Sequence, residues 1–140
     1  MERELIDDED YLAVWDRAVS IMLAAHVHTI RASLLYIRES VHGRIVNIAS
    51  TEGLGATKNI SPYTTVKYEV IGLTRSLAVE LGPEAITVNC ICLGPIRTGM
   101  TVDIPDEHKE IFAKRRAPLD RYAEPEEVTH ATLSLVLPAS

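Results

Sequence analysis

Residues 43–67 of the chain read GRIVNIASTEGLGATKNISPYTTVK. Residues 43–50 form a largely apolar run of strand length, which predicts a buried strand that ends at Ser50. Ser61 and Pro62 then predict the start of a helix, with Ser61 as the N-cap and proline at the first helical position. The stretch therefore predicts a strand, a loop and a helix in that order.

Tyr63 and Lys67 are the two residues in this stretch whose spacing indicates chemistry. Side chains four residues apart on a helix lie on one face, with Cβ atoms about 5–6 Å apart. An ammonium group stabilises a phenolate, so it makes a neighbouring phenol a better proton donor. Ser50 could direct its hydroxyl at the group that Tyr63 protonates. The alternative is an ordinary solvated pair, because helical residues at this spacing are common.

A second strand is predicted over residues 85–92, after a helix over residues 62–81 that Gly82 and Pro83 end. Gly82 is interpreted as the C-terminal glycine of that helix. Two apolar strands joined by a helix are typical of a βαβ unit with a parallel sheet and helices on both faces.

Further helices are predicted on both sides of this unit. A long one begins near Asp7 or Asp8 and meets no glycine or proline before Gly43. Roughly thirty helical residues would extend about 45 Å. Downstream, a short helix is predicted over residues 106–116 and a last one from Glu124 onward.

Length and charge limit the functional classes. At 140 residues, 46% of them apolar, the chain is expected to form one domain, residues 1–140, with a packed core. The net charge is −6, and residues 1–10 hold six acids against one base, which leaves 14 acids and 13 bases elsewhere. No basic face is expected, which argues against a nucleic-acid partner.

The cysteines and histidines show no metal-binding pattern. Cys90 and Cys92 stand two apart on a strand, so they share one sheet face and cannot pair with each other, which favours two small core residues in a reducing compartment. The five histidines share no ligand spacing and are interpreted as solvated or capping residues: His26, His28, His42, His108 and His130. We expect no metal site.

No targeting signal is visible at the N-terminus, which is acidic and precedes no cleavage site. Residues 19–25, taken as the most apolar helical stretch, are too short to span a bilayer. We therefore expect a cytoplasmic protein without a membrane partner.

Several segments together resemble the short-chain dehydrogenase/reductase family: GRIVNIAS, SPYTTVK, GLTRSLAVELGPEAITVNCI, GPIRTGM and RYAEPEEV. The resemblance runs from about residue 8 to residue 140. It implies an α/β fold with a partial doubly wound, Rossmann-like parallel sheet flanked by helices. The glycine-rich turn and the last strand of the family match no segment, so the resemblance implies an incomplete domain that lacks the N-terminal βαβ half and the final strand.

The resemblance implies an oxidoreductase that transfers a hydride between NAD or NADP and a secondary alcohol or ketone. Tyr63 would be the general acid/base, Lys67 would assist it and hydrogen-bond the nicotinamide ribose, and Ser50 would polarise the substrate oxygen. The residues implied to contact the cofactor are Tyr63, Lys67, Gly94, Pro95, Ile96 and Thr98. Residues 99–116 would form a mobile segment over the substrate.

Two positions bear on how far the resemblance holds. Met22 stands where the family often has an asparagine of a proton relay, so the relay differs or catalysis is weakened. Gly53 and Gly55 imitate a dinucleotide-binding turn, but Lys58 occupies the last glycine position and no acidic residue follows at a strand end. Both glycines are interpreted as loop residues.

Two other functions remain open. The chain could be an inactive fragment that serves as a helical dimerisation or interaction module, and in either case a homo-oligomer through helices 8–39 and 62–81 is expected from the family. A hydrolase with Ser50 as nucleophile and Lys67 as base is weakly supported, because Ser50 lies in no nucleophile-elbow sequence.

Overall fold

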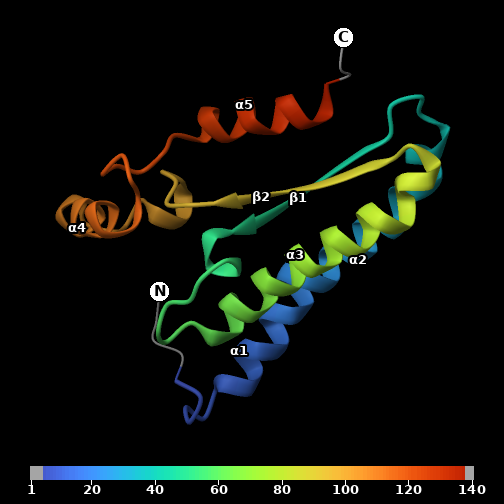
Figure 1. The fold of residues 1–140 in the computed structure, drawn as a ribbon. Coiled ribbons are helices and arrows are strands. Elements are labelled where there is room, and N and C mark those ends of the chain that lie inside the picture. Colours follow the sequence, from blue (N-terminus) through green and yellow to red (C-terminus); the bar gives the residue numbers. More distant parts are fainter. Residues whose placement is uncertain (1–4, 138–140) are drawn as a thin grey trace. The chain divides into compact units, whose positions relative to one another are not determined.

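The computed structural model describes residues 5–137 (Figure 1). Contacts divide them into two compact units, residues 5–92 and Leu93–Leu137. The secondary structure consists of α1 (Tyr11–Ala18), α2 (Ala25–Glu39), β1 (Arg44–Ser50), α3 (Ser61–Leu81), β2 (Thr87–Leu93), α4 (Asp106–Arg116) and α5 (Pro125–Val136). The expectation of a single domain over residues 1–140 stays a prediction.

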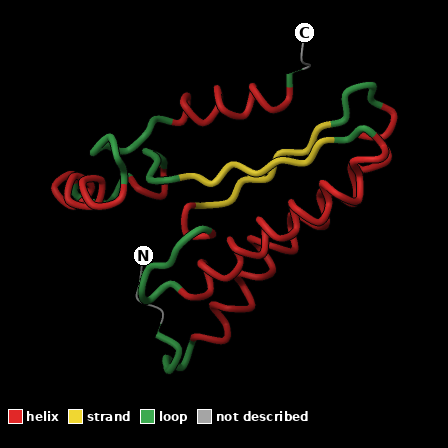
Figure 2. Tube along the Cα trace, viewed as in Figure 1, coloured by secondary structure: helices red, strands yellow, loops and turns green. Residues whose placement is uncertain are grey.

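Strands β1 and β2 form a two-stranded parallel sheet, and α3 connects them (Figures 1 and 2). This is the predicted βαβ unit. Its main core joins Ile45 of β1 and Val88 of β2 with Leu81 and Ile86, all of which are buried. The α/β class with a partial parallel sheet flanked by helices is thereby confirmed.

Helices α2 and α3 cover the same face of β1. Ile45 belongs to a cluster that includes Ile30, Leu34 and Ile37 of α2 as well as Leu77 and Ala78 of α3. Along β1, Ile45, Asn47 and Ala49 are buried, whereas Ile48 is 36% exposed. Burial in β1 therefore alternates within the first unit, although the apolar sequence of the strand predicted cover on both faces.

The long N-terminal helix forms as predicted but starts later. Asp8 does not cap it, because its carboxylate accepts a hydrogen bond from the backbone N–H of Leu5 (2.8 Å), and α1 begins after Asp10. Helices α1 and α2 are joined by a π-helical segment, Val19–Ala24, which contains Met22. Glu2 and Glu4 of the acidic start lie outside the described residues.

By length and composition alone, the helical stretch Tyr11–Glu39 could cross a membrane, with a mean hydropathy of 1.4 over its most apolar window. A core helix of a soluble protein passes the same test. The sequence interpretation took only residues 19–25 as apolar and so underestimated the stretch.

The start of α3 differs from the sequence prediction, whereas its end at Leu81, with Gly82 as the C-cap, is the predicted one. Ser61 lies inside the helix, Ile60 is the N-cap, and the Ser61 hydroxyl instead hydrogen-bonds the hydroxyl of Tyr11 (2.8 Å), which ties α3 to α1. At the other end Gly82 has a right-handed φ of −54°, and the left-handed residue is Ala85 (φ 59°). A short 3₁₀ turn, Gly82–Glu84, separates α3 from β2.

Candidate active site

Ser50, Tyr63 and Lys67 all belong to the first unit. Strand β1 ends at Ser50, which is buried. The Ser50 hydroxyl oxygen accepts a hydrogen bond from the backbone N–H of Glu52 (3.1 Å). This bond starts the short 3₁₀ turn Thr51–Gly53, so the side chain of Ser50 is oriented by the backbone that follows it.

Gly53 fixes this turn against α3. A Cβ atom at Gly53 would lie 2.7 Å from the carbonyl oxygen of Lys67 and 2.7 Å from Cδ1 of Ile71. Only glycine permits so close an approach of two backbone segments. Gly53 therefore has a packing function that the sequence interpretation, which treated it as an ordinary loop residue, did not include. It also fixes the turn after Ser50 against the backbone of Lys67.

Tyr63 and Lys67 lie on one face of α3. Lys67 Nζ is 5.6 Å from the centroid of the Tyr63 ring, a cation–π distance. The same ammonium donates a hydrogen bond to the carbonyl oxygen of Ile48 in β1 (3.3 Å). Burial lowers the pKa of Lys67, and the neighbouring Cys90 opposes this shift. The structure thus brings a partly desolvated ammonium to the ring that the sequence pairs with it.

His26 is a residue of this region that the sequence interpretation missed. Its side chain is half-buried, and its Nδ1 atom is buried without a hydrogen-bond partner among the described residues, so the solvated or capping role predicted for it stays a prediction. Burial is the largest cause of a lowered His26 pKa and the charge of Lys67 adds to it, while the backbone carbonyls of Met22 and Ile48 oppose it. The only local signal was its position one turn after Met22.

The π-helical segment Val19–Ala24 contains a residue that differs from the one the resemblance implies. Met22, which stands where the resemblance implies an asparagine, lies in Val19–Ala24, and Leu23 of the same segment packs against Ala49, Val70 and Ile71. Single π-turns inside α-helices frequently occur at functional sites. The helix is therefore irregular at the position where the chain departs from the family.

Cys90 and Cys92 are free and pack against the cluster of Ala49, Val70 and Ile71. Both are half-buried, in keeping with small residues at the edge of the core. Burial raises the pKa of Cys92, and the neighbouring Cys90 raises it further. Within residues 5–137, no group of three or more His, Cys, Asp or Glu side chains could hold a metal ion.

The residues implied to contact the cofactor's nicotinamide lie in the second unit, between Gly94 and Thr98. This segment is held at two points by Ala123, whose N–H donates to the carbonyl of Pro95 (2.9 Å) and whose carbonyl accepts from the N–H of Arg97 (2.9 Å). Ile96 forms a parallel bridge with Ala123. Ala123, which the sequence interpretation did not single out, thus stiffens the turn.

Thr101 holds the same segment from its other side. Its hydroxyl lies 3.1 Å from the carbonyl oxygen of Ile96 and accepts a hydrogen bond from the N–H of Thr98 (2.9 Å). In return, the side-chain oxygen of Thr98 accepts from the N–H of Thr101, which completes a capping box. Among residues 5–137, no hydrogen bond donated by the Thr98 hydroxyl is seen.

Comparison with known proteins places these features in a family. The profile of the family described as enoyl-(acyl carrier protein) reductase matches residues 6–140. The chain is 41% identical, over 91% of its length, to 3-alpha-(or 20-beta)-hydroxysteroid dehydrogenase of Mycobacterium tuberculosis, and covers 47% of that protein. The chain belongs to the short-chain dehydrogenase/reductase family.

Two further relatives of this short-chain dehydrogenase/reductase support its place in the family. The (2S)-[(R)-hydroxy(phenyl)methyl]succinyl-CoA dehydrogenase subunit BbsD of Thauera aromatica is 37% identical over 88% of this chain and 49% of its own. The structure of a 3-oxoacyl-[acyl-carrier protein] reductase with bound NAD from Brucella melitensis superposes with a TM-score of 0.76, at 32% identity, over 89% of this chain and 45% of its own. The chain spans about half the length of the curated relatives it matches.

Proposed function

We propose that this chain is the catalytic part of a NAD- or NADP-dependent oxidoreductase that interconverts a secondary alcohol and a ketone. The observation that carries the proposal is the position of Lys67 Nζ over the Tyr63 ring, 5.6 Å from its centroid. Membership of the short-chain dehydrogenase/reductase family and the NAD bound in a solved relative support it.

Each of the two units carries groups that suit one part of a nicotinamide nucleotide. Within the described residues, the Lys67 ammonium donates one hydrogen bond, to the carbonyl oxygen of Ile48 (3.3 Å). Because an ammonium group has three N–H donors, two remain for ribose hydroxyls. The Thr98 hydroxyl proton and the backbone of Ile96 would hold a carboxamide. When bound, the cofactor supplies or accepts the hydride.

The residues of the chain would then move and hold the proton. In ketone reduction the Tyr63 hydroxyl gives its proton to the carbonyl oxygen, and in alcohol oxidation the phenolate takes it back. The Lys67 ammonium stabilises the phenolate, because opposite charges attract strongly where water is partly excluded. The Ser50 hydroxyl, oriented by its bond from Glu52, would hydrogen-bond the substrate oxygen.

A comparison of two proteins tests this proposal. One is the 140-residue chain alone, and the other is the same chain preceded by the N-terminal half of a relative from the same family. Each is titrated with NADH and NADPH while nicotinamide fluorescence is followed. We expect binding only by the longer protein, and tight binding by the 140-residue chain alone would contradict our placement of the cofactor site.

In the longer protein, Tyr63→Phe should lower the rate of ketone reduction by roughly 10²–10⁴-fold, the range of general acid catalysis. Cofactor binding and the circular dichroism spectrum should not change. Tyr68→Phe, at an exposed tyrosine of the same helix, is the matched control and should retain the rate. Equal activity of the Tyr63→Phe variant would overturn the assignment of Tyr63.

A second candidate function is a helical interaction module without catalysis. Several large apolar side chains of the helices point to solvent: Leu12 (73% exposed), Leu35 (70%), Tyr36 (74%) and Val79 (80%). Exposed apolar side chains on neighbouring helices favour association with a second copy. Light scattering of the chain and of its Leu35→Glu variant tests this. A monomer in both cases would remove the module from consideration.

A further inference from the structure

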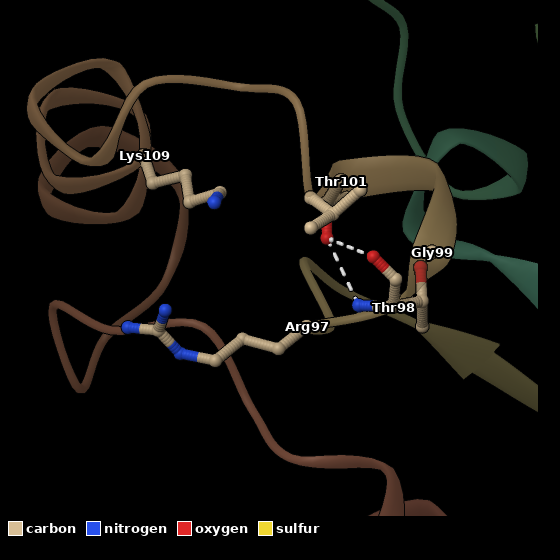
Figure 3. Close-up of a pocket in the computed structure, with 6 residues that line it drawn as sticks. Arg97, Thr98, Gly99, Thr101 and Lys109 are labelled. Carbon is tan, nitrogen blue, oxygen red and sulfur yellow. Dashed lines mark hydrogen bonds between the residues drawn. The ribbon is translucent and has the colours of Figure 1, made fainter.

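The second unit contains a cavity of about 350 Å³ beside the Gly94–Thr98 segment (Figure 3). It is lined by Arg97, Thr98, Gly99, Thr101, Val102 and Lys109. Both charged residues of this lining are cationic, and they come from different elements. Figure 3 shows the ammonium of Lys109 and the guanidinium of Arg97 extending into the same space, from α4 and from the turn respectively.

Lys109 is unusually buried for a lysine, with a side chain only 11% exposed. Its one ion-pair partner among the described residues is Asp106, at 3.4 Å, and the Asp106 side chain is 83% exposed. A long contact with a solvated carboxylate compensates a buried ammonium poorly, because the attraction is screened by water. The remaining donors of Lys109 are thus free to bind an anion.

Arg97 also keeps donors free. Its Nε atom pairs with Glu124 (3.2 Å), which engages one edge of the guanidinium group. Neither Glu124 nor Asp106 is among the residues that line the cavity, although each pairs with one of its two cations. A planar guanidinium with free N–H groups binds carboxylate and phosphate oxygens well.

We propose that Arg97 and Lys109 form a binding site for a small oxyanion, a carboxylate or phosphate group. The anion would receive hydrogen bonds from the guanidinium on one side and from the ammonium on the other. On the basis of the proposed oxidoreductase function, this group belongs to the substrate, which would then be an acidic alcohol or ketone. The oxyanion site itself does not depend on that function, because every residue that lines the cavity belongs to the second unit. The candidate catalytic residues Ser50, Tyr63 and Lys67 belong to the first unit.

The test uses the 140-residue chain and two probes, inorganic phosphate and acetate, at constant ionic strength set with sodium chloride. Backbone amide shifts are followed by NMR. We expect saturable shifts confined to residues 97–102 and the neighbourhood of Lys109. Saturation by phosphate alone assigns a phosphate group, and saturation by acetate as well assigns a carboxylate. No saturation by either probe overturns the site.

Three variants separate a built site from general attraction to positive charge. Arg97→Gln, at a half-exposed residue that can be changed without loss of the core, should weaken binding about tenfold, the equivalent of one charge-assisted hydrogen bond. Lys109→Arg keeps the buried charge and should retain binding. Lys114→Gln alters a lysine of the same helix that does not line the cavity, and should have no effect.

Equal weakening by Lys114→Gln and Arg97→Gln would show non-specific attraction and contradict the proposal. The readout is independent of the NADH titration described above. A chain that binds phosphate but, even when preceded by the N-terminal half, fails to bind cofactor would keep the oxyanion site and lose the oxidoreductase function. The reverse result would remove only the oxyanion site.

Discussion

Gly53 and Lys67 approach each other so closely that a Cβ atom on the glycine would lie 2.7 Å from the carbonyl oxygen of the lysine. This contact joins the turn after Ser50 to α3. Because the obstructing atom belongs to the backbone, it cannot rotate away, and either the turn or the helix would have to shift. The geometry of the candidate site therefore depends on the absence of a side chain at residue 53.

The variant Gly53→Ala should accordingly lose about 1–3 kcal/mol of unfolding free energy, as overpacked positions do. Gly55→Ala is the control, because its Cβ would meet only the carbonyl oxygen of Thr51 at 3.8 Å, an ordinary contact, and its φ is not positive. That control should be neutral or slightly stabilising. Urea denaturation of both variants measures the difference, and equal stability would disprove the close approach.

The buried amide of Asn47 depends on Thr74. Asn47 Nδ2 donates to the Thr74 hydroxyl (2.9 Å), which in turn donates to the carbonyl of Val70 (2.8 Å). Thr74→Val should cost about 1–3 kcal/mol, because it leaves a buried donor without a partner. Thr74→Ser keeps the hydroxyl and should cost less. If urea unfolding ranks the serine variant as the less stable, packing rather than the hydrogen bond dominates at this position.

His26 should make stability depend on pH. Its pKa is lowered from 6.5 in the folded state, so as the pH falls the unfolded chain takes up the proton first. Stability should thus decrease below about pH 6.5 and go on decreasing until the pH passes the lower folded pKa. His26→Gln should flatten this slope relative to that of the unchanged protein. Unfolding curves between about pH 7.5 and about pH 5 measure both slopes.

Glu127 should titrate far below other glutamates. Arg121 donates two hydrogen bonds to its carboxylate (2.7 and 2.9 Å), and the backbone N–H of Glu124 donates a third (2.8 Å). These bonds lower the pKa of Glu127 to about 2. The stability they contribute is complete above pH 4.5, the ordinary pKa, and is lost as the pH falls toward 2.

Arg121→Gln removes the largest cause of this shift, so the Glu127 pKa should rise toward its ordinary value. A carbon-detected NMR titration of the carboxyl group measures it directly. Arg115→Gln, a basic residue of α4, is the control and should leave the titration unchanged. A Glu127 that still titrates near pH 2 without Arg121 would refute this cause.

Local patterns predicted the elements of the fold well. Helix α4 covers Asp106–Arg116, the same residues that the sequence predicted, and β1 ends at Ser50 as expected. The helix ends were less accurate where a distant contact intervened. Ser61 was predicted to cap α3, but its hydroxyl binds that of Tyr11, fifty residues away, and the cap moves to Ile60.

The sequence alone determined the order of helices and strands, the family, and the common face of Tyr63 and Lys67. Each of these depends on a local pattern of residues in the chain. The tertiary structure alone decided that Gly53 supports Lys67, that Ile48 binds its ammonium, and that His26 Nδ1 is buried. These features join segments far apart in the chain. A periodic pattern shows which face a residue occupies, but only packing determines which partner that face meets.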